Sequence, residues 1–264
     1  MAEPWVEKRE IGPCTLYLGD CRDIAPRLDA PDLVYTSPPY LNRRTYGKAR
    51  IGCWDDLVPP AIAAIPRKPS TQLLINLGLV RIHTVVPYWN TLIARLAADG
   101  VGLRDWYVWN KQTPMPGNFS GRLWPQHEFI FHFGTQPGYL RATVPCKTAG
   151  AAAKKNAHRD PNGSVKLRSN MEPTRPNRVL GSVICAEPEQ GRIRSHHPAV
   201  QCQSVPSQLL AAFAPQRILD PFVGSGTTCV AAMALGIASV GIEIDPAYFA
   251  VACERIARAW AAHS

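Results

Sequence analysis

The 264-residue sequence lacks several features that would place it in a large class at once. No run approaches the roughly 18 apolar residues that a membrane span requires, so no membrane association is expected. Its eight cysteines include no Cys-x-x-Cys pair, which argues against a structural zinc site or a disulfide framework. The opening residues MAEPWVEKRE are polar and charged, unlike a signal peptide. These absences predict a cytoplasmic protein with reduced thiols.

Acidic residues are scarce relative to basic ones. There are 20 Asp and Glu against 29 Lys and Arg, a formal net charge of +9. The excess is concentrated between Arg141 and Arg178, where nine basic residues occur with two acids. A polyanionic partner would explain this segment, because Lys and Arg neutralise phosphates and release counterions. A solvated basic face is the alternative. The 46% hydrophobic content is that of a globular chain.

Strand and helix patterns alternate along most of the chain. Strands are predicted at Cys14–Leu18, Asp32–Thr36, Gln72–Leu77, Leu103–Asn110, His127–Phe133, Arg217–Asp220 and Ser239–Ile244. Helices are predicted at Thr84–Ala98, Thr227–Leu235 and Pro246–Ala262. This alternation predicts an α/β fold with a mainly parallel sheet, in which the two aromatic-rich strands at 103–110 and 127–133 form an antiparallel pair at one edge. Residues 135–197, rich in Gly, Pro, Asn and basic side chains, break the pattern and are expected to be either functional or disordered.

A glycine-rich turn follows the strand that ends at Asp220. It reads Pro221-Phe222-Val223-Gly224-Ser225-Gly226-Thr227 and opens a predicted helix, so free backbone N–H groups face the turn. Glu243 ends the next strand, where a carboxylate can accept both hydroxyl groups of a ribose. No third glycine follows Gly226 at the spacing of the dinucleotide fingerprint, so a nucleoside ligand is favoured over a dinucleotide.

A second motif, Thr36-Ser37-Pro38-Pro39-Tyr40, ends another predicted strand. Each proline fixes its own backbone φ angle and lacks an N–H, so the chain leaves the strand on a fixed path. A hydroxyl group and an aromatic ring are thereby held at the end of the strand. Alternatively, the same residues could serve only to end the strand.

Together, TSPPY and the downstream DPFVGSGTT and GIEID segments resemble the S-adenosylmethionine-dependent amino-methyltransferases of DNA. Because the TSPPY motif precedes the glycine-rich turn, the resemblance is to the circularly permuted β class. It implies a class I, Rossmann-like sheet of seven mainly parallel strands with a basic recognition insert. The implied segments are a catalytic half at residues 1–134, a target-recognition insert at 135–195 and a cofactor-binding half at 196–264.

The same resemblance implies roles for individual residues. Ser37 and the carbonyl group of Pro38 would accept hydrogen bonds from the target amine, Pro39 would stiffen the motif, and Tyr40 would stack on a base flipped out of the duplex. Binding of S-adenosylmethionine is implied for the following residues: Asp20, Thr36, His197, Pro198, Asp220, Phe222, Gly224, Ser225, Gly226, Thr227 and Glu243. DNA contacts are expected from Arg43, Arg44, Lys48, Lys154, Lys155, Arg159, Lys166 and Arg168. No metal site is expected.

In this family a serine at the first position of the motif goes mostly with cytosine N4, so Ser37 favours a site-specific cytosine-N4 enzyme acting on double-stranded DNA. An adenine-N6 enzyme on the same scaffold is the first alternative. A protein glutamine methyltransferase and a DNA- or cofactor-binding protein without turnover are two others. The family also implies a prokaryotic or phage restriction-modification setting, in which a homodimer and a cognate restriction endonuclease are candidate partners.

Overall fold

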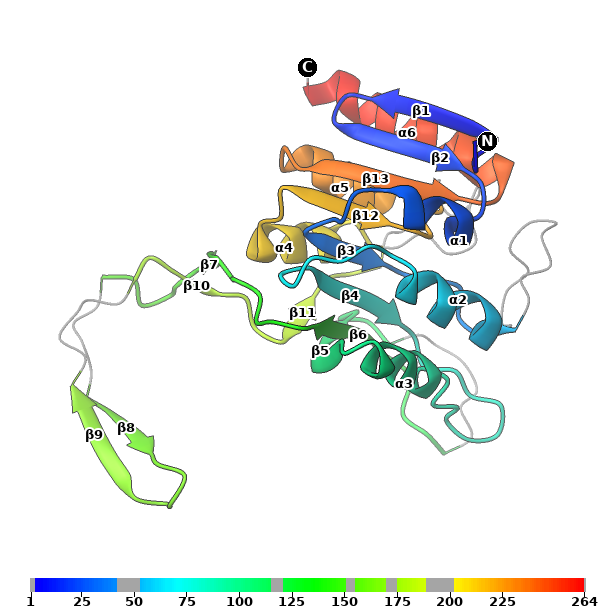
Figure 1. The fold of residues 1–264 in the computed structure, drawn as a ribbon. Coiled ribbons are helices and arrows are strands. Elements are labelled where there is room, and N and C mark those ends of the chain that lie inside the picture. Colours follow the sequence, from blue (N-terminus) through cyan, green and yellow to red (C-terminus); the bar gives the residue numbers. More distant parts are fainter. Residues whose placement is uncertain are drawn as a thin grey trace.

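The computed structural model describes residues 3–41, 53–114, 121–150, 155–169, 175–188 and 202–263, without the side chains of 155–158, 166–169 and 263. Its centre is a nine-stranded sheet in the order β1-β2-β13-β12-β3-β4-β6-β5-β11 (Figure 1). Strands β1 and β6 run opposite to the rest. The sheet strands are β1 (Glu7–Ile11), β2 (Cys14–Leu18), β3 (Leu33–Thr36), β4 (Gln72–Leu77), β5 (Gly102–Asn110), β6 (His127–Gly134), β11 (Val183–Cys185), β12 (Arg217–Asp220) and β13 (Ala238–Glu243).

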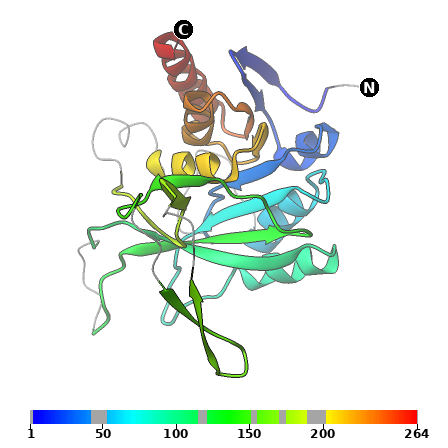
Figure 2. The same cartoon turned by 90° about the vertical axis from the view of Figure 1, so that its left-hand side faces the viewer.

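Helices cover both faces of this sheet, as Figure 2 shows. They are α1 (Cys21–Ile24), the 3₁₀ turn η1 (Ala25–Arg27), α2 (Trp54–Ala63), α3 (Asn90–Ala98), α4 (Ser204–Phe213), α5 (Thr227–Ala234) and α6 (Pro246–His263). Helices α1 to α3 pack on one face, and α4 to α6 pack on the other. Strand β3 serves both cores, because Val34 points to the first face while Leu33 and Tyr35 point to the second. Among the described residues, no helix combines the length and apolar content needed to cross a membrane.

All seven predicted strands are present, with ends that differ by at most one residue from the prediction. The aromatic-rich β5 and β6 are antiparallel, but β5 is not at the edge, because the unpredicted β11 pairs with it. Strand β1 was also not predicted, since its sequence EKREI is almost entirely charged and lies at an exposed edge. The order β2-β13-β12-β3-β4-β6-β5 places the C-terminal strands β12 and β13 among the N-terminal ones, which is the permuted arrangement expected.

The helix predictions are partly wrong. Helices α5 and α6 form as expected, but α3 begins at Asn90 rather than Thr84. The six residues before it contain Pro87, which disfavours helical backbone at Val86, and Val85 instead forms a bridge with Arg81. Helix α2 was not predicted because it contains Pro59 and Pro60. Pro60 leaves the carbonyl group of Asp56 without a helical donor, and Arg22 donates to that oxygen at 3.4 Å.

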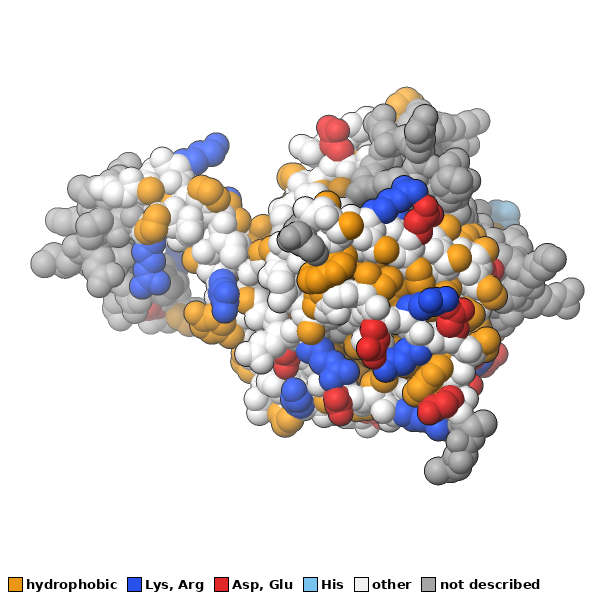
Figure 3. Space-filling model, turned by 90° about the horizontal axis from the view of Figure 1, so that it is seen from above, with side chains coloured by type: hydrophobic (Ala, Val, Ile, Leu, Met, Phe, Trp, Pro, Cys, Tyr) orange, Lys and Arg blue, Asp and Glu red, His pale blue; other side chains and the backbone are white. Residues whose placement is uncertain are grey.

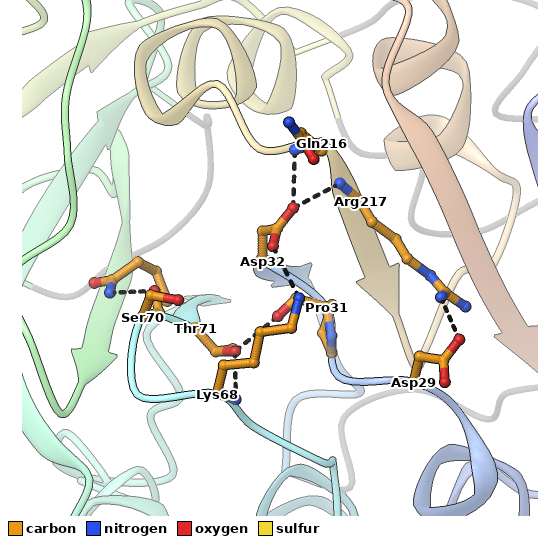
Figure 4. A network of polar contacts seen from close by, with 9 residues as sticks. Asp29, Pro31, Asp32, Lys68, Ser70, Thr71, Gln216 and Arg217 are labelled. Atoms are coloured by element: carbon orange, nitrogen blue, oxygen red, sulfur yellow. Dashed lines mark hydrogen bonds and ion pairs between the residues drawn. The ribbon is translucent and has the colours of Figure 1, made fainter.

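The carboxyl ends of the parallel strands define what we call the carboxyl edge of the sheet, and their beginnings define the amino edge. Asp32, at the start of β3, holds the amino edge together (Figure 4). Its carboxylate accepts the backbone N–H groups of Gln216 and Arg217, both at 3.0 Å, and pairs with Lys68 at 3.4 Å. These contacts fix β3 beside β12, the two strands that carry the predicted catalytic and cofactor motifs.

Within the predicted insert, the described residues from Arg141 to Val179 form an arm that is rooted at the amino edge. Strand β6 ends at that edge, and the backbone N–H of Arg141 then donates to Ala212 at the end of α4. Beyond this point lie two small antiparallel ribbons, β7 (Ala142–Pro145) with β10 (Asn177–Val179) and β8 (Lys155–Arg159) with β9 (Val165–Ser169). The chain returns through β11, which starts at the amino edge. Figure 1 shows the β8–β9 ribbon standing away from the sheet.

Charge on the face formed by β1 and α6 is mixed. Figure 3 shows acidic and basic side chains interspersed there. Ion pairs join Lys8 to Glu10, Arg9 to Glu7 and Arg258 to Glu254. Exposed pairs of this kind contribute little to stability, and they leave this face without an excess of one sign.

Candidate active site at the carboxyl edge of the sheet

The predicted catalytic and cofactor motifs meet at the carboxyl edge. Thr36 ends β3, Asp220 ends the adjacent β12, and Glu243 ends β13 on the far side of β12. Chain connections leave β12 and β3 in opposite directions along the sheet, so this is a topological switch point, where α/β sheets commonly bind their ligands. Strand β6 runs the other way and therefore brings its first residues, His127 and Glu128, to the same edge.

A buried hydrogen bond joins the two motifs. The Thr36 hydroxyl donates to Asp220 Oδ1 at 2.6 Å, and the backbone N–H of Phe222 donates to the same oxygen at 3.1 Å. Burial raises the pKa of the Asp220 carboxyl to about 6, opposed by hydrogen bonds that include one from Thr228. Thr36 and Asp220 thus tie the two strand ends together. Neither the Asp220 carboxyl nor the Thr36 hydroxyl is exposed, since both residues are buried.

The glycine-rich turn is held by Glu243. Gly224 and Gly226 have φ angles of 51° and 82°, which suit glycine. The Glu243 carboxylate accepts the backbone N–H of Gly224 at 2.8 Å, and those of Ile244 and Asp245 at 3.0 and 2.9 Å. Burial raises the pKa of Glu243 to about 7, although the three N–H groups oppose that rise. The carboxylate that the sequence assigns to a ribose also shapes the turn.

Arg255 of α6 holds the same turn from the other side, a role that sequence inspection missed. Its Nη1 donates to the carbonyl oxygen of Ser225 at 2.6 Å, to Ser225 Oγ at 2.8 Å and to Thr227 Oγ1 at 3.1 Å. Gly226 packs so closely on α6 that a Cβ there would lie 3.1 Å from Ile256. Ser225 and Thr227, which were predicted to bind the cofactor, therefore have their hydroxyl groups directed to Arg255.

Asp20 follows β2, next to β13 in the sheet. It caps α1 by accepting the backbone N–H of Arg22 at 2.8 Å, and its Oδ2 also pairs with the Arg22 guanidinium at 2.6 Å. The hydrogen bonds from Arg22 lower the pKa of Asp20. The side chain thus lies at the carboxyl edge and is partly used by its own helix cap.

Beyond β3, the serine of the predicted catalytic motif joins a chain of hydrogen bonds. Ser37 Oγ lies 3.0 Å from the Tyr40 hydroxyl, which donates to Glu128 Oε2 at 2.9 Å. Burial raises the pKa of Tyr40 well above its usual range, and the nearby Glu128 charge acts in the same direction. Pro38 is buried and Pro39 half-buried, so the motif is held from within the fold.

Glu128 is the centre of a polar cluster that the sequence did not reveal. Asn76 Nδ2 donates to its Oε2 at 2.9 Å, and Lys111 Nζ pairs with its Oε1 at 2.6 Å. The side chains of Lys111 and Glu128 are only 13% and 14% exposed. A usable signal was present: the pairs Asn110-Lys111 and His127-Glu128 end and begin two antiparallel strands, so the strand pairing brings them together.

The Tyr40 ring lies against the backbone of Gly78, just after β4. A Cβ built on Gly78 would approach Tyr40 Cε2 to 2.7 Å, closer than any side chain tolerates. The carbonyl oxygen of Gly78 accepts the Tyr88 hydroxyl at 2.8 Å, which fixes this turn. The ring position therefore depends on the absence of a side chain at residue 78.

The remaining predicted residues fall into three groups. His197, Pro198, Arg43, Arg44, Lys48 and Lys154 lie outside the described residues. Lys155, Lys166 and Arg168 are described only as backbone of the β8–β9 ribbon, where Arg159 is exposed. Phe222 is half-buried against the core on the α1–α3 face. Within the described ranges, no group of His, Cys, Asp and Glu side chains could hold a metal ion.

Comparison with known proteins gives consistent matches over most of the chain. A family model described as "DNA methylase", for N6 and N4 methyltransferases, matches residues 31–254. The type II methyltransferase M.SmaI of Serratia marcescens is 27% identical over 93% of this chain and 91% of its own. M.XycI of Xanthomonas campestris pv. cyanopsidis, also a type II methyltransferase, is 28% identical over 92% of this chain and 87% of its own.

Solved structures share the fold. The PvuII DNA methyltransferase, described as cytosine-N4-specific, superposes with a TM-score of 0.69 at 15% identity, covering 97% of this chain and 95% of that one. M1.HpyAVI, solved as a complex with S-adenosylmethionine, gives a TM-score of 0.62 at 20% identity, covering 92% and 98%. The sheet is thus the Rossmann-like sheet of class I methyltransferases. Since the family model spans most of the sequence, this chain belongs to the DNA methylase family of N6 and N4 methyltransferases.

Proposed function

We propose that this protein transfers a methyl group from S-adenosylmethionine to the exocyclic N4 amine of a cytosine in double-stranded DNA. The observation that carries the proposal is the hydrogen bond between Thr36 and Asp220. It joins the strand end that leads into Ser37 to the strand end that leads into the glycine-rich turn. A hydrogen-bond acceptor for an amine is thereby fixed beside a nucleoside-binding turn.

The residues around the turn fit S-adenosylmethionine. The cofactor carries a ribose with two hydroxyl donors, and its methionine end carries an ammonium group near a sulfonium centre. Of the roughly four lone-pair sites of the Glu243 carboxylate, three are used by backbone donors, so one remains to accept a hydrogen bond from the ribose. Asp20 offers a second carboxylate at the same edge. When bound, S-adenosylmethionine supplies an activated methyl group to a nitrogen nucleophile.

The chemistry asks the protein for hydrogen-bond acceptors. The lone pair of an exocyclic amine is delocalised into the ring, which makes the nitrogen a poor nucleophile. Ser37 Oγ and the carbonyl oxygen of Pro38 would accept its two N–H groups and favour a tetrahedral nitrogen with a localised lone pair. The two prolines hold both acceptors without further ordering, which lowers the entropic cost of the reacting geometry.

Cytosine is proposed because Ser37 occupies the first position of the motif, and because the PvuII enzyme with the same fold is described as cytosine-N4-specific. Adenine N6 is the alternative, since the matching family model includes N6 methyltransferases. Both bases present an amine flanked by a ring nitrogen. Either base must leave the duplex for its amine to reach Ser37 at the carboxyl edge of the sheet.

The basic arm is proposed to contact DNA phosphates. Its charge supports this role, but its root lies at the amino edge, opposite Ser37. We therefore expect the arm to contact the duplex away from the target base. Arg43, Arg44 and Lys48 follow the catalytic motif directly and are the better candidates for contacts beside that base. A cognate endonuclease and a homodimer remain proposals that rest on the family.

One experiment tests base and activity together. The purified protein is incubated with unmethylated genomic DNA and S-adenosylmethionine carrying a labelled methyl group, and the DNA is then digested to nucleosides. Mass spectrometry should detect labelled N4-methylcytosine. Labelled N6-methyladenine instead would move the assignment to the alternative, and absence of label in DNA with both ligands bound would indicate a binding protein without turnover. Sequencing of the methylated DNA gives the target site.

A further inference from the structure

We propose that Glu128 is a positioning residue that sets the direction of the hydrogen bonds through Tyr40, and so keeps Ser37 Oγ an acceptor toward the target amine. The inference rests on the proposed function and deepens it. It assigns to Glu128 a preference for bases with an amino group over bases with a keto group at the same ring position. Glu128 lies on β6, 91 residues after Ser37 in sequence, and it does not contact Ser37 directly in the described hydrogen bonds.

The direction follows from counting protons along the chain of contacts. An ionised carboxylate can only accept, so the single hydroxyl proton of Tyr40 must point to Glu128 Oε2, 2.9 Å away. The Tyr40 oxygen is then an acceptor on its other side. Ser37 Oγ lies 3.0 Å from it and must supply its own proton to that contact. The lone pairs of Ser37 are left for other donors, such as the N–H of an amine.

Two further donors face Glu128, so its described hydrogen bonds use it only as an acceptor. Lys111 Nζ lies 2.6 Å from Oε1, and Asn76 Nδ2 lies 2.9 Å from Oε2. Asn76 cannot reverse its amide without a penalty, because the same nitrogen also donates to the carbonyl oxygen of Phe129 at 3.2 Å. Three donors, from Lys111, Asn76 and Tyr40, thus converge on one carboxylate that is 14% exposed.

For the substrate, this direction of the hydrogen bonds favours an amino group over a keto group at the position of the cytosine amine. A Ser37 oxygen with free lone pairs pairs with N–H donors, and it faces the lone pairs of a keto oxygen without a proton between them. Uracil and thymine carry such an oxygen where cytosine has its amine. A site built to accept hydrogen bonds rejects a ligand that leaves the acceptors unpaired.

The direct test replaces the carboxylate by an amide of the same shape. In Glu128→Gln the oxygen is expected to face the charged Lys111, so the NH₂ group faces Tyr40 and Asn76. Asn76 then loses its acceptor at residue 128, and the Tyr40 proton, no longer accepted there, is free to turn to Ser37. Ser37 would in turn present its proton outward. Binding is measured with a duplex carrying the site found by methylation sequencing, and with the same duplex carrying uracil in place of the target cytosine. The ratio of the two affinities is compared between the wild type and the variant, so that the effect of the mismatch cancels.

We expect the cytosine-to-uracil preference of Glu128→Gln to fall about tenfold or more below that of the wild type. The rate of methyl transfer at saturating cofactor should fall about a hundredfold, with the Kd of S-adenosylmethionine changed less than about twofold. Tyr40→Phe, which breaks the chain while keeping the ring, should lower the same preference. Glu254→Gln makes the same charge change on the exposed face of α6 and should leave all three quantities unchanged.

An unchanged cytosine-to-uracil preference in both Glu128→Gln and Tyr40→Phe, in proteins that melt cooperatively, overturns the inference. This holds even if turnover is lost, because a merely structural role of Glu128 would also lower turnover. This outcome is distinct from failure of the proposed function, which is decided by the wild type alone. If the wild type methylates adenine, the same comparison is made with hypoxanthine in place of adenine, since hypoxanthine also exchanges the amine for a keto group.

Discussion

The hydroxyl group of Thr36 donates a 2.6 Å hydrogen bond to the carboxylate of Asp220, across 184 residues of sequence. Both side chains are buried, and the bond is a direct side-chain link between the strand that carries TSPPY and the strand that leads into the glycine-rich turn. The position of the TSPPY motif and that of the glycine-rich turn are therefore coupled through the buried carboxylate of Asp220.

Thr36→Val should test that coupling. Valine keeps the shape of the side chain but removes the donor, which leaves Asp220 with one fewer partner. We expect a loss of about 1–3 kcal/mol in the free energy of unfolding, measured by urea denaturation. Both turnover and cofactor affinity should decrease. Thr36→Ser retains the hydroxyl group and is the matched control; equal losses in the two variants would show that the methyl group, and not the bond, matters.

Ser37→Ala should separate chemistry from cofactor binding. Its hydroxyl group is directed to Tyr40 and the proposed base, and no described contact links it to the glycine-rich turn. Turnover at saturating cofactor should fall about a hundredfold or more, while the Kd for S-adenosylmethionine stays within about twofold. A parallel loss of both in rate and titration measurements would contradict the role given to Ser37.

The affinity for S-adenosylmethionine should depend on pH through Glu243. Burial raises its pKa from 4.5 to about 7, so below that pH the carboxyl group is protonated and is a poorer acceptor for the ribose hydroxyl groups. We expect the Kd to rise as pH falls below about 7, by up to about tenfold per unit. Isothermal titration at several pH values measures this. Glu243→Gln should bind more weakly at pH 8 and show a flatter profile.

The same group predicts a trend in stability. A pKa that is higher in the folded protein means that the folded state binds the proton more tightly. The stabilisation from Glu243 is therefore complete below about pH 4.5 and is lost as pH rises through about 7. Relative to Glu243→Gln, the wild type should lose stability between pH 5 and 8. The difference between the two denaturation curves isolates this group from the other titrating residues.

Arg255→Ala should loosen the glycine-rich turn. Three oxygen atoms of Ser225 and Thr227 lose their common donor, so the turn must be ordered when the cofactor binds. We expect about a tenfold weaker cofactor affinity and a lower Tm, with near-normal turnover at saturating cofactor. Arg258→Ala, three residues further along α6 but exposed, should leave cofactor affinity as in the wild type.

Gly78→Ala should displace Tyr40. The added methyl group would lie 2.7 Å from the ring, so Tyr40 must move and its contacts with Ser37 and Glu128 must lengthen. Turnover should fall at least tenfold with cofactor affinity retained. Gly102→Ala is the matched control, because a Cβ at Gly102 meets no atom within 4 Å. Normal turnover in Gly78→Ala would mean that the ring position is not important for the reaction.

Much of the fold could be predicted because the buried strands carry their own signal. Leu74 and Ile75 point to opposite faces of the sheet, and both are buried because helices cover both faces. A strand in this position needs a continuous apolar run. Elements stabilised by distant partners gave no such signal. Helix α2 forms despite Pro59 and Pro60 because its apolar residues pack in the core on the α1–α3 face, and β11 forms because β5 offers it an edge.

The residues of the candidate site likewise fall into those that the sequence could identify and those that it could not. The two motifs could be recognised because each is a contiguous stretch whose residue types meet a local requirement, such as a positive φ angle at Gly224. Glu128, Lys111 and Arg255 lie outside these stretches and act across strand or helix packing, and for Glu128 and Lys111 the antiparallel pairing of two strands was the one usable signal. Their contribution depends on distances that only the folded chain defines.

The arm leaves and re-enters the protein at the amino edge, while Ser37, Glu128 and Glu243 all lie at the carboxyl edge. Lengthening, shortening or exchanging the arm therefore changes the chain between Glu128 and Glu243 only on the side of the sheet away from both residues. An arm taken from a related methyltransferase would be joined at the amino edge, away from the residues of the candidate site. The architecture makes the arm a replaceable part, so chimaeras joined near Arg141 and Val183 should keep the cofactor site intact while changing what the arm touches.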